Sequence, residues 1–102
     1  MTSTKKIKVF SPFDNSLVQE IKMTSESEAF KILEVSYNLS QKKAPIPPYE
    51  RIKILERFSQ LLIEKKSEII AQTIKEGGKP LVDSQIEVQR AIEGVKIAIH
   101  SI

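Results

Sequence analysis

Apolar residues recur at helical spacing in the middle of the chain. They fall i, i+3, i+4 and i+7 along one face: Ile54, Leu55, Phe58, Leu61 and Leu62. Pro47 and Pro48 precede this run, and a proline in the first helical turn costs nothing because its missing N–H has no helical partner. The pattern predicts a helix that begins at residue 48 and buries those five side chains.

A second apolar patch follows, formed by Ile69, Ile70 and Ile74. Ser67 precedes it and is a residue type that caps helix N-termini. Residues 77–80, Gly-Gly-Lys-Pro, then form a stop signal, because glycine adopts the left-handed conformation that closes a helix and proline prevents its continuation. Residues 48–76 are therefore expected to form two helical segments.

The first quarter of the chain has strand and turn patterns. Residues 7–10 and 17–23 alternate between apolar and polar positions, and the Pro-Phe-Asp-Asn-Ser run of residues 12–16 between them is typical of a turn. This predicts a β-hairpin over residues 7–23. Two strands alone are marginally stable in water, so the hairpin is expected to lean on another element.

A helix over residues 25–40 is predicted after the hairpin. Ser25 and Glu28 have the spacing of a capping box, in which each side chain bonds the other residue's backbone N–H. Residues 41–47 are expected to form a loop, because three prolines fall within residues 45–48.

The last predicted helix covers residues 81–102. Its apolar residues alternate in steps of four and three, and we call this set the C-terminal seam: Val88, Ile92, Val95, Ile99 and Ile102. Gly94 costs roughly 1 kcal/mol relative to alanine, which suggests close packing against a neighbour. The seam continues to the last residue without a stop signal, so the sequence is expected to be cut within an element. With these helical segments behind a hairpin, the fold class is mainly α with a short N-terminal β-hairpin. Its apolar faces exceed what so short a chain can cover, and a homo-oligomer through an exposed C-terminal helix is expected.

Composition narrows the function classes. The chain has 102 residues, a net charge of +3 and a pI near 9.2, but acidic and basic residues alternate along it, as on a solvated helix face. The absence of cysteine excludes disulfides, thiolate metal sites and a cysteine nucleophile within this chain. No secretory signal or membrane-spanning run is recognisable, so a cytoplasmic protein without a membrane partner is expected.

Read in order, these segments resemble the N-terminal part of the aldehyde dehydrogenase superfamily. SPFDNSLVQEIKM is similar to that family's opening hairpin, although Ser11 replaces an asparagine and Asn15-Ser16 replace Gly-Glu. The central segment is similar to its Pro-x-x-x-Arg-x-x-x-Leu helix and the following Glu-x-Gly-Lys-Pro and Glu-Val motifs. The matching positions are Arg51, Leu55, Glu76, Gly78, Lys79, Pro80, Glu87 and Val88.

The resemblance implies that residues 1–102 are the N-terminal portion of an α/β aldehyde dehydrogenase-like fold, within a larger cofactor-binding domain. It also implies oxidation of an aldehyde to an acid with NAD or NADP, through a cysteine nucleophile and a glutamate base. The family places those residues later in the chain. We therefore assign no catalytic, cofactor-binding or metal-binding residue here and expect the chain alone to be inactive. The alternative is a stand-alone helical interaction or oligomerisation module without catalysis.

A few polar residues have a functional reading beside a structural one. Glu87 and Arg90 are either ligand contacts or, more often, a surface ion pair. Lys79 lacks the rest of a phosphate-loop motif and is expected to serve the helix end. His100 has no ligand or triad partner at suitable spacing. Arg51 is expected to have a structural role, either pairing with Glu50 or Glu56 or reaching across to another element.

Nucleic-acid binding is a disfavoured third alternative. It rests on three lysines and two aromatic residues in the predicted hairpin: Lys5, Lys6, Lys8, Phe10 and Phe13. Single-strand binders combine a basic groove with repeated stacking positions, which this hairpin lacks.

Overall fold

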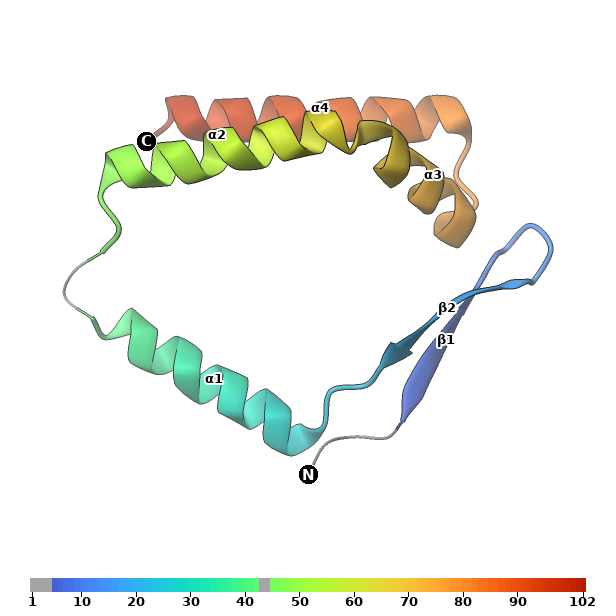
Figure 1. The fold of residues 1–102 in the computed structure, drawn as a ribbon, viewed down its shortest axis with the longest axis horizontal. Helices are drawn as coiled ribbons and strands as arrows, with labels where there is room; N and C mark the ends of the chain where they lie inside the picture. The colour runs from blue at the N-terminus through green and yellow to red at the C-terminus, as the bar shows by residue number, and fades with distance from the viewer. Residues whose placement is uncertain (1–4, 43–44) are drawn as a thin grey trace.

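The computed structural model describes residues 5–42 and 45–102, and Figure 1 shows their arrangement. Two strands are followed by four helices: β1 (Lys6–Phe10), β2 (Leu17–Lys22), α1 (Glu26–Ser40), α2 (Pro48–Glu64), α3 (Lys66–Gly77) and α4 (Leu81–His100). Helices α2, α3 and α4 pack together, whereas α1 stands apart from them and the hairpin lies next to α3 at its turn. The fold class predicted from the sequence is confirmed.

The N-terminal hairpin forms as its sequence pattern predicts. β1 and β2 are antiparallel, with Ile7 opposite Ile21 and an irregularity next to the turn. Within the turn Asn15 adopts φ 59°, a left-handed conformation that asparagine tolerates. The Asp14 carboxylate accepts hydrogen bonds from the backbone N–H and the hydroxyl of Ser16, at 3.0 and 2.6 Å. These bonds fix the turn and hold the pKa of Asp14 below its ordinary value.

Helix α1 begins at the predicted capping box. The Ser25 hydroxyl accepts the Glu28 backbone N–H at 3.2 Å, and the Glu28 carboxylate accepts the Ser25 N–H at 3.0 Å. No residue of α1 is buried, and α1 shares no extended contact with another described helix. Its large apolar side chains are all more than half exposed: Phe30, Ile32, Leu33, Val35, Tyr37 and Leu39. The surplus of apolar surface expected from the sequence is confirmed on this helix.

The hydrophobic core lies between α2, α3 and α4. Its buried members are Ile70, Val88 and Ile92, with Leu62, Ile69 and Ile74 packed around them. Two small residues, Ser59 on α2 and Ser84 on α4, are also buried, at 6% and 0% exposure. Small side chains at these positions allow the helices to approach closely. Within the described part of the chain, the Ser84 hydroxyl has no hydrogen-bond partner.

The set of buried residues predicted for the first central helix, α2, is partly wrong. Ile54 and Phe58 are 57% and 48% exposed, whereas Leu55 and Leu62 are half-buried on the side of Ser59. The apolar surface of α2 is wider than the part that its neighbours in this chain cover. Periodicity locates the apolar side of a helix, but only the packed neighbour selects the buried stripe within it.

The junction between α2 and α3 differs from the predicted cap. The break falls at Lys65, which has φ −98° and ψ 9°, and no side chain caps α3. Ser67 therefore lies inside α3, so the predicted N-cap is wrong. A backbone kink at one residue is sufficient here, because Ile69 N–H still bonds the Lys65 carbonyl at 3.0 Å.

The C-terminal seam has the predicted phase, but the expectation that it is exposed is wrong. Val88 and Ile92 are buried against α2 and α3, and Val95 and Ile99 are half-buried. Only Ile102, which follows the end of α4 and is 43% exposed, remains open. The seam therefore belongs to the core of this chain and does not present a free surface to a partner.

The predicted loop over residues 41–47 includes residues 43–44, which lie outside the described part of the chain. At the other end, Ser101 caps the last turn of α4, and its hydroxyl donates to the Ile97 carbonyl at 2.8 Å. Helix α4 therefore ends two residues before the boundary predicted from the sequence.

Candidate functional site

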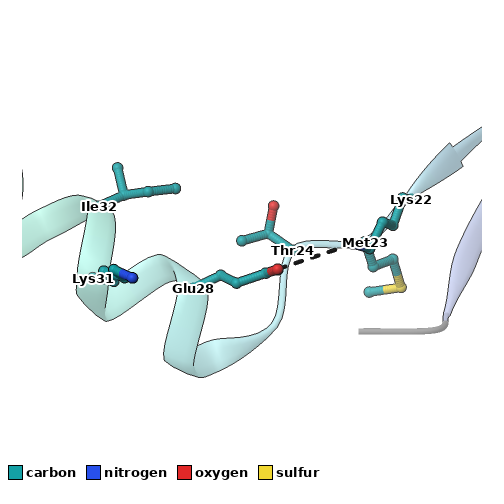
Figure 2. Close-up of a pocket in the computed structure, with 6 residues that line it drawn as sticks. All are labelled: Lys22, Met23, Thr24, Glu28, Lys31 and Ile32. Atoms are coloured by element: carbon teal, nitrogen blue, oxygen red, sulfur yellow. Dashed lines mark ion pairs between the residues drawn. The ribbon is translucent and has the colours of Figure 1, made fainter. Parts of the chain in front are cut away.

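An open hollow of about 410 Å³ lies where β2 meets α1 (Figure 2). It is lined by Lys22, Met23, Thr24, Glu28, Lys31 and Ile32. The Lys22 ammonium lies 4.0 Å from the Glu28 carboxylate. The Ser25 N–H bond and then the nearby lysine charge hold the pKa of Glu28 below its ordinary value of 4.5.

This hollow lacks the groups for catalysis. Glu28 is the only carboxylate among its lining residues and is already used by the capping box, so it is not poised as a general base. The lining set also places no histidine beside Thr24 that could act as a general base. The hollow therefore lies between two elements, and its lining does not combine a nucleophile with a base.

The turn between α3 and α4 holds the hairpin. Gly78 has φ 64° and closes α3, with its N–H bonded to the Ile74 carbonyl at 2.9 Å. A β-carbon added at Gly78 would stand 2.7 Å from Cγ of Pro12 in the hairpin turn, so the two segments are in tight contact. Beside this contact, the Gln19 amide donates to the Glu76 carboxylate at 2.9 Å. We call Pro12, Gln19, Glu76 and Gly78 the hairpin latch.

A charged hollow of about 310 Å³ lies along the first half of α4, lined by Lys79, Asp83, Ile86, Glu87 and Arg90. The i, i+3 spacing suggested that Glu87 pairs with Arg90. In the structure Glu87 instead forms an ion pair with Lys79. The pair connects the turn before α4 to its second turn. Lys79 is thus paired with a carboxylate of the helix that it precedes.

The remaining candidates stay apart. His100 is exposed in the last turn of α4, and Arg51 lines an apolar hollow of about 400 Å³ with Ile54 and Ile102. Among residues 5–42 and 45–102, no salt bridge joins Arg51 to Glu50 or Glu56, and Arg51 instead shares this hollow with Ala98 and Ile102 from the C-terminal end of the chain.

The basic hairpin is partly neutralised by its own acidic residue. Lys6 lies 3.5 Å from Glu20, and Lys8 is the register partner of Glu20. Phe13 is 94% exposed at the turn, but no second aromatic ring of the hairpin is similarly open. This arrangement does not provide the groove and stacking platform of a single-strand binder.

Neither a metal cluster nor a membrane span is found in the described part of the chain. Residues 5–42 and 45–102 contain no group of three or more histidine, aspartate or glutamate side chains that could hold a metal ion. Within those same ranges, none of the helices combines the length and apolar character needed to cross a membrane.

Comparison with known proteins defines the family. The family model described as "Aldehyde dehydrogenase family" matches residues 1–102, so the chain belongs to the aldehyde dehydrogenase family. It is similar to a malonate-semialdehyde dehydrogenase of Bacillus cytotoxicus, with 29% identity over 97 residues, covering 95% of this chain and 20% of that protein. It is also similar to aspartate-semialdehyde dehydrogenase 1 of Pseudomonas canavaninivorans, with 32% identity, covering 90% of this chain and 20% of that protein.

The fold is also shared with a solved structure. The crystal structure of an NAD-dependent benzaldehyde dehydrogenase from Corynebacterium glutamicum matches with a TM-score of 0.86 and 27% identity, covering 95% of this chain and 21% of that one. The chain therefore has the fold of the N-terminal part of an aldehyde dehydrogenase, and spans about a fifth of the length of the relatives it matches.

The motif positions that resembled the family have structural roles in this chain. Glu76 and Gly78 belong to the hairpin latch, Pro80 precedes α4, and Val88 lies in the core. Sequence reasoning missed the pairing of Pro12 with Gly78. The glycine itself was a signal, but its partner lies more than sixty residues away in the sequence and required the tertiary structure.

Proposed function

We propose that this chain is the N-terminal scaffold segment of an NAD(P)-dependent aldehyde dehydrogenase that oxidises an aldehyde to an acid. In this proposal residues 1–102 form part of a larger cofactor-binding domain and contribute no catalytic residue. The observation that supports it most strongly is the match over 95% of the chain to an enzyme of which this chain covers only 21%.

The uncovered apolar surface supports the same proposal. The chain holds an open arrangement in which α1 stands away from α2 (Figure 1), and its extents are 51 × 40 × 16 Å. Phe30 and Leu33 on α1 are more than 60% exposed, and monomeric proteins rarely leave large contiguous apolar patches in water. The remaining four-fifths of a dehydrogenase would cover these faces and supply the nucleophile that a chain without cysteine cannot supply.

A graft tests this proposal. The segment of the Corynebacterium benzaldehyde dehydrogenase that matches this chain is replaced by residues 1–102, and aldehyde-dependent NAD reduction is followed by absorbance. The chimera is expected to fold and to reduce NAD, whereas the isolated chain gives no reduction above a buffer control.

The control is the same graft with Phe30→Asp and Leu33→Asp, which should fail to assemble because charges would be buried against the enzyme body. If the parent graft stays soluble but inactive, or if the isolated chain turns over aldehyde, the scaffold proposal is wrong.

The second candidate function is a stand-alone helical interaction module. It is favoured by α1, whose apolar face has no partner among the described elements. A module of this kind would bind through α1 without any dehydrogenase body. The graft experiment distinguishes the two candidate functions, because only a scaffold segment gives a chimera that reduces NAD.

We further propose that the protein acts in the cytoplasm as a homo-oligomer. The location is inferred from membership of the aldehyde dehydrogenase family alone. Cell fractionation tests the location, and light scattering of the purified chain tests self-association. Because the C-terminal seam is buried, any contact made through α4 must use another face of that helix.

A further inference from the structure

The turn of the hairpin contains a peptide unit of a chemically reactive type. Asn15 precedes Ser16, and both residues are exposed between β1 and β2. Asparagine is a thermolabile residue, because the backbone nitrogen of the following residue can attack its side-chain carboxamide. This attack is least hindered where the following residue is small. The other asparagine of the chain, Asn38, precedes the bulkier Leu39 inside α1, so the sequence makes Asn15 the more reactive of the two.

The reaction consumes only water. The Ser16 backbone nitrogen forms a bond to Cγ of Asn15, and the bond from Cγ to the amide nitrogen breaks. The proton lost by the Ser16 nitrogen goes to the amide nitrogen, which leaves as ammonia. Water then opens the cyclic imide at either carbonyl and gives aspartate or isoaspartate, in which the main chain passes through the former side-chain carbonyl. Nothing is oxidised or reduced, and the exposed position of Asn15 gives water access to it.

In the folded turn the attacking nitrogen is already occupied. The Ser16 N–H donates to one oxygen of the Asp14 carboxylate at 3.0 Å, and the Ser16 hydroxyl donates to the same oxygen at 2.6 Å. Removing the proton from this nitrogen would break a hydrogen bond to a charged acceptor. It would also place a negative charge next to the carboxylate. Both effects make the first step of the reaction less favourable.

Two backbone hydrogen bonds hold the same arrangement. The Ser11 N–H donates to the Ser16 carbonyl and the Asn15 N–H donates to the Ser11 carbonyl, each at 2.8 Å. They close the turn on both sides of the reactive peptide unit. While they persist, the backbone at Asn15 is not free to rotate and bring the Ser16 nitrogen onto Cγ.

We propose that Asn15 is a site of spontaneous deamidation and that Asp14 is the residue that slows this reaction in the folded turn. Conversion to isoaspartate lengthens the backbone between Asn15 and Ser16, so the two hydrogen bonds to Ser11 can no longer form together. Pro12 lies in the same turn and is in tight contact with Gly78. The modified turn therefore releases the hairpin latch, slowly and irreversibly.

Peptide mapping by mass spectrometry tests the site and its protection. The 102-residue chain is incubated near neutral pH, both folded and in urea, and conversion is followed separately at Asn15 and Asn38. Conversion at Asn15 should be slower in the folded chain than in urea. In the folded chain Asp14→Ala should accelerate it by about threefold or more, the factor that corresponds to one lost hydrogen bond. In urea the same substitution should have no effect, because the protecting bond exists only in the folded turn.

Two variants separate the hydrogen bond from the charge and from the fold. Asp14→Asn keeps an acceptor oxygen for the Ser16 N–H, so conversion at Asn15 should be slower than in Asp14→Ala; fragment spectra distinguish conversion at residue 14 from conversion at Asn15. Glu20→Gln removes the same charge from β2 without touching the turn and should leave the rate unchanged. Circular dichroism before and after incubation confirms that each variant is folded.

Amide hydrogen exchange tests the release of the latch. The isoaspartate form, separated by chromatography, should exchange faster than the parent across β1 and β2. Asn15→Asp carries the same charge in an ordinary backbone and should change the exchange less.

Three results would overturn the proposal. Equal conversion at Asn15 in the folded chain and in urea would show that the turn gives no protection. An Asp14→Ala rate no higher than that of Glu20→Gln would show that Asp14 is not the protecting residue. Unchanged exchange in the isoaspartate form would show that the modification does not reach the latch. None of these measurements depends on NAD reduction, so they do not decide the graft experiment.

Discussion

Replacing Gly78 by alanine should detach the hairpin from α3. The substitution acts twice, because φ 64° is unfavourable for an L side chain and because the new β-carbon would stand 2.7 Å from Pro12 Cγ. The left-handed conformation alone costs about 1–2 kcal/mol for a non-glycine residue. The steric conflict forces the hairpin turn away, which also breaks the exposed Gln19–Glu76 hydrogen bond, with a net value of about 0.5–1.5 kcal/mol. The total loss expected from these two contributions is about 1.5–3.5 kcal/mol.

Urea unfolding measures the total loss of unfolding free energy, and amide hydrogen exchange shows which elements the Gly78→Ala substitution destabilises. Exchange should accelerate across β1 and β2 and remain slow at the core residues of α4, because the latch is the described contact between the hairpin and the helical unit. A uniform acceleration over the whole chain would show that the hairpin and the helices unfold together.

A second substitution isolates the steric part of the destabilisation caused by Gly78→Ala. In a Pro12→Ala background the nearest remaining turn atom is Cβ, which would lie 3.5 Å from the β-carbon of an alanine at residue 78, an ordinary contact. Gly78→Ala should then cost only the conformational part, about 1–2 kcal/mol. Equal costs in both backgrounds would show that Pro12 and Gly78 do not touch in solution, and a cost near zero would refute the left-handed helix end as well.

Other substitutions probe the core and the α1 cap. Ser84→Ala should leave stability unchanged or raise it by up to about 1 kcal/mol in thermal unfolding, because the buried hydroxyl has no partner, whereas a marked loss would reveal a hydrogen bond there. Ile92→Ala should cost about 2–5 kcal/mol, and Phe58→Ala clearly less because its ring is 48% exposed; equal losses would place Phe58 in the core. The depressed pKa of Glu28 gives a stabilisation that is complete above its unfolded value near 4.5 and is lost as the pH falls through the folded-state pKa. Glu28→Gln should remove this part of the acid dependence of α1 helicity, and an unchanged circular dichroism titration would contradict the assigned capping role.

The elements of this protein could be predicted from local sequence alone. The Ser25–Glu28 capping box, the Asp14-Asn15 turn and the glycine stop at residue 78 each act within a few residues, and all three are found where expected. The phase of the C-terminal seam is also correct, because Val88 and Ile92 are apolar at helical spacing whichever neighbour covers them. The family followed from the order of these local motifs.

The faces that are buried were decided only by the tertiary structure. Helix α2 has a broad apolar surface, and α4 packs on the stripe that contains Leu55 and Ser59, so Phe58 remains half exposed. In the same way, the seam expected to bind a second copy is covered by α2 and α3, and Ile86 and Ile97 on the opposite side of α4 are exposed instead. Periodicity depends on a single helix, whereas burial depends on the separation and orientation of two packed elements. Small residues that lie far apart in the sequence, such as Ser59, Ser84 and Gly78, set that separation by allowing close approach.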